Sequence, residues 1–322
     1  MISKKKIKAV GLFSGGLDSI LATKLIVDQG IVVTALIFDS PFFSVKNKSV
    51  ARAGAKKLGV PLHIINLKKD YLKMIRSPRY GYGSAVNPCI DCRIFMFKKA
   101  KFFMEKTKAN FVFTGEVLGQ RPMSQHRHSL ELTAKDSDLS DLLLRPLSAR
   151  LLDETKPEKE GWVDREKLLS ISGRSRKEQL ALAQKYRITT YSTPAGGCLL
   201  TEKKYAEKLK DFWNYKKEIT LREVSLLKFG RYFVFQNAKI IVGRNEDENK
   251  KLLKLKSSND YFFTCPDFPS PITLLIGDKT EKNIQEAARL TVRYSDACDN
   301  DKKIVVEYGS NKLDNKICVL NP

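Results

Sequence analysis

The chain has 322 residues, 42% of them hydrophobic, which is enough for a substantial core and is expected to form two domains. No apolar run reaches the roughly 18 residues that a membrane helix needs, and the basic N-terminus leads directly into a strand pattern, so we expect a cytoplasmic protein with no membrane partner. Its 58 Lys+Arg and 36 Asp+Glu give a net charge of +22, which predicts a polyanionic partner, nucleic acid before acidic membrane.

The first 115 residues alternate apolar, strand-like runs with helical segments. Strands are predicted at 8–13, 32–38, 62–66 and 111–114, and helices at 17–29, 48–58 and 93–106. Apolar strands that alternate with helices predict an α/β fold, in which helices cover both faces of a parallel sheet. Ligands of such sheets bind at the carboxyl ends of the strands. The residues expected at that edge are 14–19, Asp39, Ser40, Gly115 and Glu116.

Residues 14–19 read Ser-Gly-Gly-Leu-Asp-Ser, between the first predicted strand and the first predicted helix. A glycine-rich turn that opens a helix directs backbone N–H groups at a phosphate. Gly15 and Gly16 permit positive φ and a close approach, and Ser14 and Ser19 add hydroxyl donors. Asp18 is expected to hold a Mg²⁺ ion that bridges phosphates. The Gly-Lys-Ser/Thr ending of a Walker A loop is absent, which indicates a different nucleotide loop or an ordinary glycine turn.

The rest of the chain predicts a second, smaller domain. After a polar region at 116–175, a helix is predicted over 162–183 with an interruption at Gly173, followed by a glycine turn at 191–201 and a basic helical stretch at 203–228. After residue 229 the hydrophobic pattern changes and predicts a hairpin (231–243), a helix (246–254), strands (261–264 and 272–276), a helix (281–294) and a closing strand (304–308). We therefore predict a nucleotide domain at 1–205, a basic linker at 206–228 and a small α+β domain at 229–322.

Lysines crowd the start of the linker, and their clustering favours a nucleic-acid footprint. They are Lys203, Lys204, Lys208, Lys210, Lys216 and Lys217.

Six cysteines are few for a disulfide scaffold, and cysteines of a reducing compartment are more often metal ligands or catalytic groups. Cys89 and Cys92 form a Cys-x-x-Cys motif before a helix, and Cys198 follows two glycines. Three thiols are too few for a closed four-cysteine zinc site. They suit a [4Fe–4S] cluster with one iron lacking a protein ligand, or a relay in which one cysteine carries a persulfide. The other cysteines, Cys265, Cys298 and Cys318, are predicted to be small buried residues.

Taken together, these motifs resemble those of a known superfamily. Residues 14–19 resemble the PP-loop of the ATP pyrophosphatases, an adenine nucleotide alpha hydrolase-like fold. With the Pro-Cys-x-x-Cys and Gly-Gly-Cys motifs, the stretches at 114–125, 145–149, 173–179 and 193–201 resemble a tRNA thiouridine synthetase of the thiamine/4-thiouridine or 2-thiouridylase type. The C-terminal domain is similar to the RNA-binding domain of NFACT proteins, through residues 230–233, 241–249 and 287–295.

The resemblance implies a reaction and a set of roles. ATP with Mg²⁺ would adenylate a uridine carbonyl oxygen of tRNA, and sulfur from free sulfide or a persulfide protein would then displace AMP. The catalytic residues would be Asp18 and the cluster or relay cysteines Cys89, Cys92 and Cys198. The nucleotide would contact Phe13, Ser14, Gly15, Gly16, Leu17, Asp18 and Ser19, the backbone of Ile37 and Phe38, and Gly115 with Glu116. Arg121, Arg174 and Arg176 are candidates for phosphate or tRNA contacts.

Other functions remain open at this point. A PP-loop ligase that adenylates a carboxylate would use the same loop without the cysteines. An RNA-binding protein whose nucleotide domain only senses ATP would use neither for catalysis. A dithiol switch at Cys89 and Cys92 ranks last, because it leaves Cys198 and the PP-loop without a role. Nothing in the sequence separates 2-thiolation from 4-thiolation.

Overall fold

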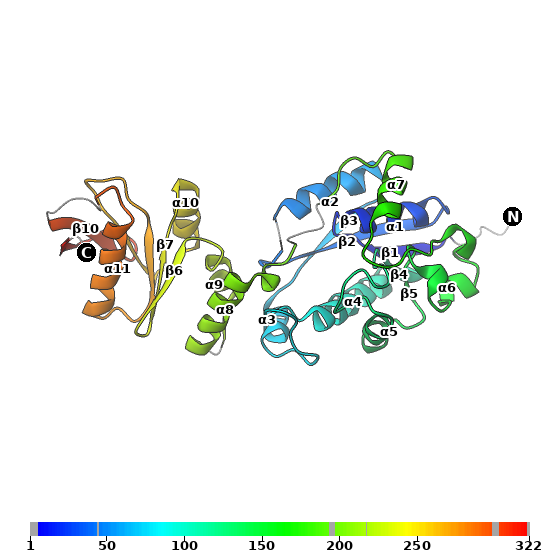
Figure 1. Ribbon diagram of the computed structural model, residues 1–322, viewed down its shortest axis with the longest axis horizontal. Helices are drawn as coiled ribbons and strands as arrows, with labels where there is room; N and C mark the ends of the chain where they lie inside the picture. The colour runs from blue at the N-terminus through cyan, green and yellow to red at the C-terminus, as the bar shows by residue number, and fades with distance from the viewer. Residues whose placement is uncertain (1–5, 44, 193–196, 217, 298–302, 321–322) are drawn as a thin grey trace. The chain divides into compact units, whose positions relative to one another are not determined.

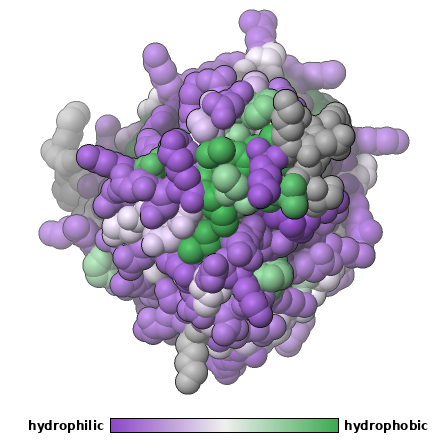
Figure 2. All heavy atoms as spheres, turned by 90° about the vertical axis from the view of Figure 1, so that its left-hand side faces the viewer, coloured by the Kyte–Doolittle hydropathy of each residue, from purple (hydrophilic) through white to green (hydrophobic). Residues whose placement is uncertain are grey.

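The computed structural model describes residues 6–43, 45–192, 197–216, 218–297 and 303–320, and the chain forms two compact units, Met1–Lys203 and Lys204–Pro322 (Figure 1). In these ranges no helix is both long and apolar enough to span a membrane. Figure 2 shows one face of the molecule, where hydrophilic side chains surround an apolar patch.

Residues 1–203 carry 36 Lys+Arg and 19 Asp+Glu, and residues 204–322 carry 22 and 17, so most of the net positive charge belongs to the first unit.

The first unit is built on a five-stranded parallel sheet with the spatial order β3-β2-β1-β4-β5. Its strands are β1 (Lys8–Leu12), β2 (Val32–Asp39), β3 (Leu62–Asn66), β4 (Phe111–Thr114) and β5 (Leu143–Leu144). Every neighbouring pair is parallel, so the carboxyl ends of the strands meet at one edge. The four strands predicted for this region are present, and the predicted parallel α/β fold is confirmed.

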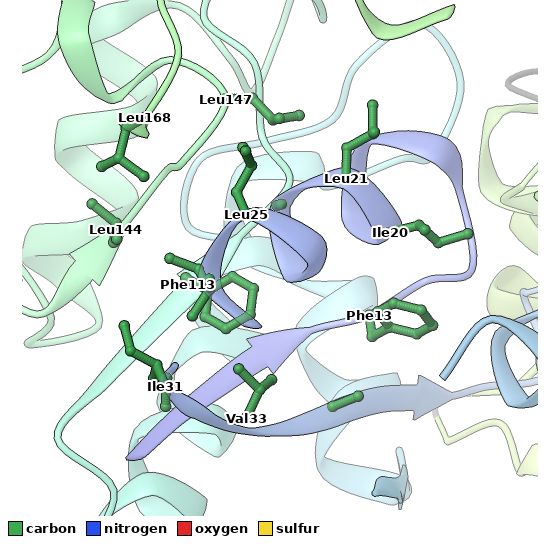
Figure 3. Close-up of a cluster of buried hydrophobic side chains, with 14 of the residues drawn as sticks. Phe13, Ile20, Leu21, Leu25, Ile31, Val33, Phe113, Leu144, Leu147 and Leu168 are labelled. Carbon is green, nitrogen blue, oxygen red and sulfur yellow. The ribbon is translucent and has the colours of Figure 1, made fainter. Parts of the chain in front are cut away.

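Helices cover both faces of this sheet (Figure 1). On one face, α1 (Leu17–Val27), α2 (Val45–Lys57) and α7 (Lys177–Lys185) share a buried apolar core with the strands, part of which Figure 3 shows. On the other face, α4 (Cys89–Lys106) packs against β1 and β4. Two further helices, α3 (Lys69–Arg76) and α5 (Arg127–Asp136), contact α4.

The helix predicted over 162–183 is wrong for most of its length. Within the described residues between 149 and 201, the helical segments are α7, the short α6 (Lys156–Lys159) and the 3₁₀ turns Ala149–Leu151, Arg165–Lys167 and Leu199–Thr201. Val163, Leu168 and Ile171 are buried in the α1 core, but from an irregular segment. The N–H groups of Leu169 and Ile171 donate to the carbonyl oxygens of Pro146 and Leu147, so this backbone is satisfied by a neighbouring segment and needs no helix.

The second unit contains a six-stranded antiparallel sheet with the order β11-β10-β8-β9-β7-β6. The strands are β6 (Arg231–Phe235), β7 (Ala238–Val242), β8 (Tyr261–Thr264), β9 (Thr273–Gly277), β10 (Lys303–Gly309) and β11 (Asn315–Leu320). Helix α11 (Glu281–Arg293) packs against the sheet, and α10 (Glu246–Leu255) follows β7. The predicted small α+β domain is present, but the strand expected to close it is followed by β11.

Two helices, α8 (Lys203–Tyr215) and α9 (Leu221–Leu226), occupy the range expected for a basic linker. Asp211 of α8 binds the sheet, since its Oδ2 lies 2.8 Å from Nζ of the buried Lys239 and accepts a hydrogen bond from the Tyr232 hydroxyl. Lys216 pairs with Glu223 at 3.1 Å. Lys216 of this stretch therefore also has a structural partner, and the boundaries predicted at 205 and 228 stay predictions.

We expect Gly115→Ala to destabilise the first unit. A Cβ at Gly115 would lie 2.6 Å from the carbonyl of Asp18 and from the backbone nitrogen of Ser19, and backbone atoms of a packed helix cannot move aside cheaply. The expected loss is about 1–3 kcal/mol in the free energy of unfolding, measured by urea denaturation. Gly197→Ala is the control, because nothing lies within 4 Å of its added Cβ. Equal stability of the two variants would contradict this packing argument.

Candidate functional site

The turn between β1 and α1 presents unpaired helix N–H groups at the carboxyl edge of the sheet. Gly15 has a φ of +79°, and a Cβ there would lie 2.9 Å from the backbone nitrogen of Ala51, so the turn requires glycine. Helix α1 begins after Gly16 with no side-chain cap. Ser14 is exposed beside it. The first turn of α1 is therefore open to an anion such as a phosphate.

Three other residues of the predicted nucleotide loop have structural roles. The side chains of Phe13 and Leu17 are buried in the core, so only their backbone can contact a ligand. The hydroxyl of Ser19 donates to the carbonyl oxygen of Gly16 at 2.8 Å, which stabilises the turn.

The Asp18 side chain is largely buried, and one of its two carboxylate oxygens has no hydrogen-bond partner among the described residues. Its Oδ2 accepts a hydrogen bond from Gln120 Nε2 at 3.2 Å, whereas Oδ1 is buried and has no partner among the described residues. Burial raises the pKa of Asp18, and the Gln120 hydrogen bond and the charges of Arg176 and Arg121 oppose that rise. An unpaired carboxylate oxygen beside a phosphate-binding turn fits a Mg²⁺ ligand.

Gln120 and Arg176 reach Asp18 from two loops that run side by side. Leu118 forms a parallel bridge with Ser172, and the Gly173 N–H donates to the Leu118 carbonyl at 2.7 Å. Ser148 ties both loops together, because its hydroxyl accepts from Leu118 N at 2.9 Å and donates to the Ile171 carbonyl at 2.7 Å. The motifs around 118, 148 and 173 thus form one wall beside Asp18 at the candidate site.

More buried polar atoms lack partners near this wall. Within the described ranges they include Nε of Arg176, both side-chain amide atoms of Gln179 and the hydroxyl of Ser192. Orphaned buried polar groups are rare in proteins and indicate a missing ligand or ion. Gln179 and Gln120 were not among the predicted site residues. The signal for both was their place in the stretches 114–125 and 173–179. Arg174 is exposed and has no assigned contact.

The end of β2 offers a backbone edge for adenine. Leu36 accepts the Phe13 N–H with its carbonyl at 2.8 Å, on the β1 side. Backbone groups alternate between the two neighbours of a parallel strand, so Phe38 faces the same side, one step beyond the end of β1. Ile37 instead pairs with β3. Of the two predicted adenine contacts, the geometry favours Phe38.

The predicted contact through Glu116 has a different environment. This carboxylate is buried, with Oε2 3.1 Å from Arg145 Nε and Oε1 3.4 Å from Arg93 Nε. Its ion pairs connect the end of β4 with α4 and with the segment after β5. Gly115 packs on the backbone of Asp18 and Ser19, so its role at the site is to let β4 approach α1.

The three cysteines expected to act together lie near one another. Cys89 and Cys92 occupy the first turn of α4. Cys198 forms an isolated antiparallel β-bridge with Phe43, which follows β2. The N–H of Leu199, the residue after Cys198, donates to the Phe42 carbonyl at 2.9 Å. Both α4 thiols contribute to the electrostatic environment of Cys198. Burial, the largest influence, raises the pKa of Cys92 to about 11 and that of Cys198 to about 12.

Tyr71 of α3 is fully buried among these thiols. Its hydroxyl lies 3.1 Å from Cys92 Sγ, and its ring packs against Phe42, Phe43 and Phe95 at centroid distances of 5.4–6.5 Å. Asn87 Nδ2 donates to Cys89 Sγ at 3.4 Å. The Tyr71 hydroxyl and the Asn87 amide therefore each lie within hydrogen-bond distance of one sulfur atom, and such contacts can orient sulfur ligands.

Asp91, inside the Cys-x-x-Cys motif, is a structural residue. Its two carboxylate oxygens accept the backbone N–H groups of Arg79 and Tyr80 at 2.8 and 3.0 Å. These bonds fix the loop before α4 and hence the position of Cys89.

Thiols are the ligand type that an iron–sulfur cluster takes, and the three cysteines lie near one another. Among the residues that the structure describes, no three or more His, Cys, Asp or Glu side chains are gathered as for a metal ion. The cluster therefore stays a proposal. Of the other cysteines, Cys265 is buried as predicted, Cys318 is exposed, which makes that prediction wrong, and Cys298 lies outside the described residues.

The nucleotide loop and the cysteines are connected by one short segment. The Ser192 N–H donates to the Gly15 carbonyl at 2.8 Å, and six residues later Cys198 bridges to Phe43. Six residues can span at most about 22 Å. The two sites thus belong to one edge of one sheet. Residues 193–196, part of the predicted glycine turn, lie outside the described ranges.

Two carboxylates of this unit are expected to respond oppositely to removal of charge. Because the pKa of Asp18 is raised from its ordinary value of 3.8, its ionised form opposes folding above that range. Asp18→Asn should therefore be at least as stable as the parent at neutral pH, and this advantage should shrink as the pH falls through the raised pKa toward 3.8. Asp91→Asn should lose about 1–3 kcal/mol, because it weakens two backbone hydrogen bonds. Thermal unfolding across the pH range tests both, and a destabilised Asp18→Asn would refute the first.

Family models match part of each unit. Residues 5–154 match the family model of the thiamine biosynthesis protein ThiI, which includes Cys89 and Cys92 but ends before Cys198. Residues 230–322 match the family model of the NFACT protein RNA binding domain.

Curated relatives point the same way. The tRNA-specific 2-thiouridylase MnmA of Symbiobacterium thermophilum is 26% identical over 223 residues, 62% of this chain and 54% of the relative. The protein of the same name from Syntrophotalea carbinolica is 30% identical over 113 residues, 32% of each chain. The chain thus spans about half of the first relative and a third of the second.

Among solved structures, a 4-thiouridine synthetase–RNA complex with bound ATP matches with a TM-score of 0.37 and 24% identity, over 63% of this chain and 50% of that one. A likeness at this TM-score adds nothing to the account of the site. On the sequence matches, residues 5–154 are similar to the ThiI family, part of the chain is similar to tRNA-specific 2-thiouridylases, and residues 230–322 are similar to the NFACT protein RNA binding domain.

Proposed function

We propose that this protein catalyses the ATP-dependent replacement of a uridine carbonyl oxygen in tRNA by sulfur. The observation that carries the proposal is the convergence of two sites on one sheet edge. An anion-binding turn with an unpaired buried carboxylate lies at one end of the 192–198 segment, and three thiols lie at the other. The relatives named 2-thiouridylases and the NFACT-type domain support RNA as the substrate.

In this proposal ATP binds with its phosphates on the first turn of α1. The N–H groups after Gly16 and the Ser14 hydroxyl would bind the β- and γ-phosphates, and Phe38 would contact adenine through its backbone. Asp18 Oδ1 would coordinate Mg²⁺, and Arg176 would neutralise the phosphates from the facing loop. The bound nucleotide would satisfy the polar atoms that lack partners in this wall.

The first chemical step makes the carbonyl oxygen a good leaving group. The uridine oxygen attacks the α-phosphorus, an O–P bond forms, and the bond between the α-phosphorus and the bridging oxygen breaks. Pyrophosphate leaves, and the base loses its N3 proton to solvent. The helix N–H groups would stabilise the charge that develops on pyrophosphate, and Mg²⁺ held by Asp18 would supply further positive charge there.

The second step exchanges oxygen for sulfur. A sulfur nucleophile adds to the activated ring carbon, the C–O bond breaks, and AMP leaves. With hydrosulfide as donor the step needs no reductant. With a persulfide on one cysteine, a second cysteine must cleave the S–S bond, and the resulting disulfide must be reduced by an external dithiol.

We favour a [4Fe–4S] cluster held by Cys89, Cys92 and Cys198 over the relay. Such a cluster supplies an iron without a protein ligand, at which hydrosulfide can bind. The supporting observation is that the three thiols lie near one another and around Tyr71, whereas a relay needs only two of them. Asn87 and Tyr71 would donate hydrogen bonds to ligand sulfurs, which orients them.

Single serine substitutions of Cys89, Cys92 and Cys198 should abolish thiouridine formation while ATP–pyrophosphate exchange remains. Asp18→Asn should abolish both, because it removes the Mg²⁺ ligand needed for the first step. Thiouridine is measured by mass spectrometry of nucleosides after incubation with tRNA, ATP and sulfide. Cys318→Ser is the matched control, since this cysteine is exposed and lies in the second unit.

Anaerobic purification separates the sulfur mechanisms. About four irons and matching sulfide per chain, lost in Cys198→Ser, are expected for the cluster. An iron-free protein that still thiolates tRNA would replace the cluster by the relay. Cysteine variants that retain full activity on a carboxylate substrate, with no thiouridine from the parent, would contradict thiolation and indicate an adenylating ligase.

A further inference from the structure

Two exposed arginines of the second unit share one tyrosine ring. The guanidinium carbon of Arg231 lies 4.4 Å from the ring centroid of Tyr294, and that of Arg293 lies 5.8 Å from it. Arg231 begins β6, whereas Tyr294 ends α11, so residues more than sixty positions apart meet here. Both arginines are exposed, and Tyr294 is half-buried.

The ring is anchored from below. Phe233, two residues along β6, packs against Tyr294 with a centroid distance of 6.0 Å, and both rings border the core under α11. The position of Tyr294 is therefore set by packing, and the guanidinium groups that lie on it lose less side-chain entropy when they bind a ligand.

These two arginines differ from a third one nearby. Arg289, one turn earlier on α11, binds Glu286 through two contacts of 2.7 Å. Arg231 and Arg293 have no carboxylate within ion-pair distance among the residues that the structure describes. The partial negative charge at the C-terminal end of α11 can account for the position of the Arg293 side chain. Arg231 belongs to β6, so its position on the ring of Tyr294 is not explained by the helix that carries Arg293.

Stacking leaves the useful edge of a guanidinium free. An arginine that lies on an aromatic ring uses its flat face, while its N–H groups stay in the plane for bidentate contact with a phosphate. Two such groups on one ring form a cationic and aromatic surface. Unpaired nucleotides suit it, because their phosphates bind the arginine edges and their bases stack on guanidinium or aromatic planes.

We propose that Arg231, Arg293 and Tyr294 form an RNA-contacting site of the second unit, which binds an unpaired stretch of backbone. The two segments come from the stretches at 230–233 and 287–295 that carried the sequence resemblance. That the RNA is a tRNA rests on the proposed function, whereas the site itself rests on the geometry of the second unit. RNA is favoured over an anionic membrane because an aromatic ring between two cations suits stacked bases, and lipid headgroups carry no bases.

The test uses the full chain and an unmodified tRNA transcript, with binding measured by fluorescence anisotropy over a series of salt concentrations. The double variant Arg231→Ala/Arg293→Ala should weaken binding about tenfold or more and lower the slope of log K against log salt by about 1.4 to 1.8, the counterions of two phosphates. Arg289→Ala is the control, because it removes one positive charge from the same helix as Arg293, and it should leave the slope unchanged. An unchanged slope in the double variant overturns the proposal.

Tyr294 tests the platform separately from charge. Tyr294→Phe keeps the ring and should bind within about twofold of the parent, whereas Tyr294→Ala should lose the ordered arginines and bind like the double variant. Thermal unfolding shows whether Tyr294→Ala is folded. If Tyr294→Ala is unfolded, Tyr294→Phe still tests the platform, because weak tRNA binding by a folded Tyr294→Phe contradicts a stacking role for the ring.

Two further measurements separate this inference from the proposed function. Vesicles containing phosphatidylserine serve as the alternative polyanion, and a double variant that loses vesicle binding but keeps tRNA binding overturns the RNA assignment. ATP–pyrophosphate exchange, measured with saturating tRNA, reports the adenylation step. If exchange and thiouridine are absent from the parent while the salt slope still depends on Arg231 and Arg293, the RNA site stands and the proposed reaction fails.

Discussion

The close packing of β4 on the first turn of α1 is the constraint on which the site depends. Gly115 has no side chain, so the end of β4 can touch the backbone of Asp18 and Ser19. That contact fixes the direction in which α1 leaves the sheet, and therefore where its unpaired N–H groups point. It also brings the Glu116 ion pairs next to the site, which connect β4 to α4 and so to the turn that carries Cys89 and Cys92.

Much of the fold could be predicted because its signals are local. The buried strands are continuous apolar runs, and the Ser-Gly-Gly-Leu-Asp-Ser turn lies between a strand and a helix, so β1, α1 and Asp18 were found from sequence alone. The amphipathic α3 was missed, although its buried face supplies Tyr71, because it is a short helix between polar residues. The irregular segment around Ile171 was mistaken for a helix, since buried apolar residues occur in it without helical hydrogen bonds.

The walls of the site could not be predicted in the same way. Gln120 and Arg176 reach Asp18 only because Leu118 and Ser172 pair across more than fifty residues, a long-range contact that no local pattern encodes. Glu116 is a related case. Its position after a strand predicts a ligand contact, which stays a prediction, whereas its ion pairs with two arginines that are distant in sequence could not be predicted. Residue type and strand position identify the edge of the sheet, whereas long-range hydrogen bonds decide which side chains face a ligand.

The distribution of charge suggests how the two units divide the work of RNA binding in the proposed reaction. Residues 1–203 have the larger surplus, 36 Lys+Arg against 19 Asp+Glu, and residues 204–322 are closer to balance with 22 against 17. A diffuse positive surface attracts a polyanion from any direction and is screened by salt. A few ordered contacts, such as Arg231 and Arg293 on Tyr294, add little to long-range attraction but can fix the register of the RNA. A base that must leave its stack to reach a buried sulfur site needs both, because attraction alone does not select which nucleotide arrives.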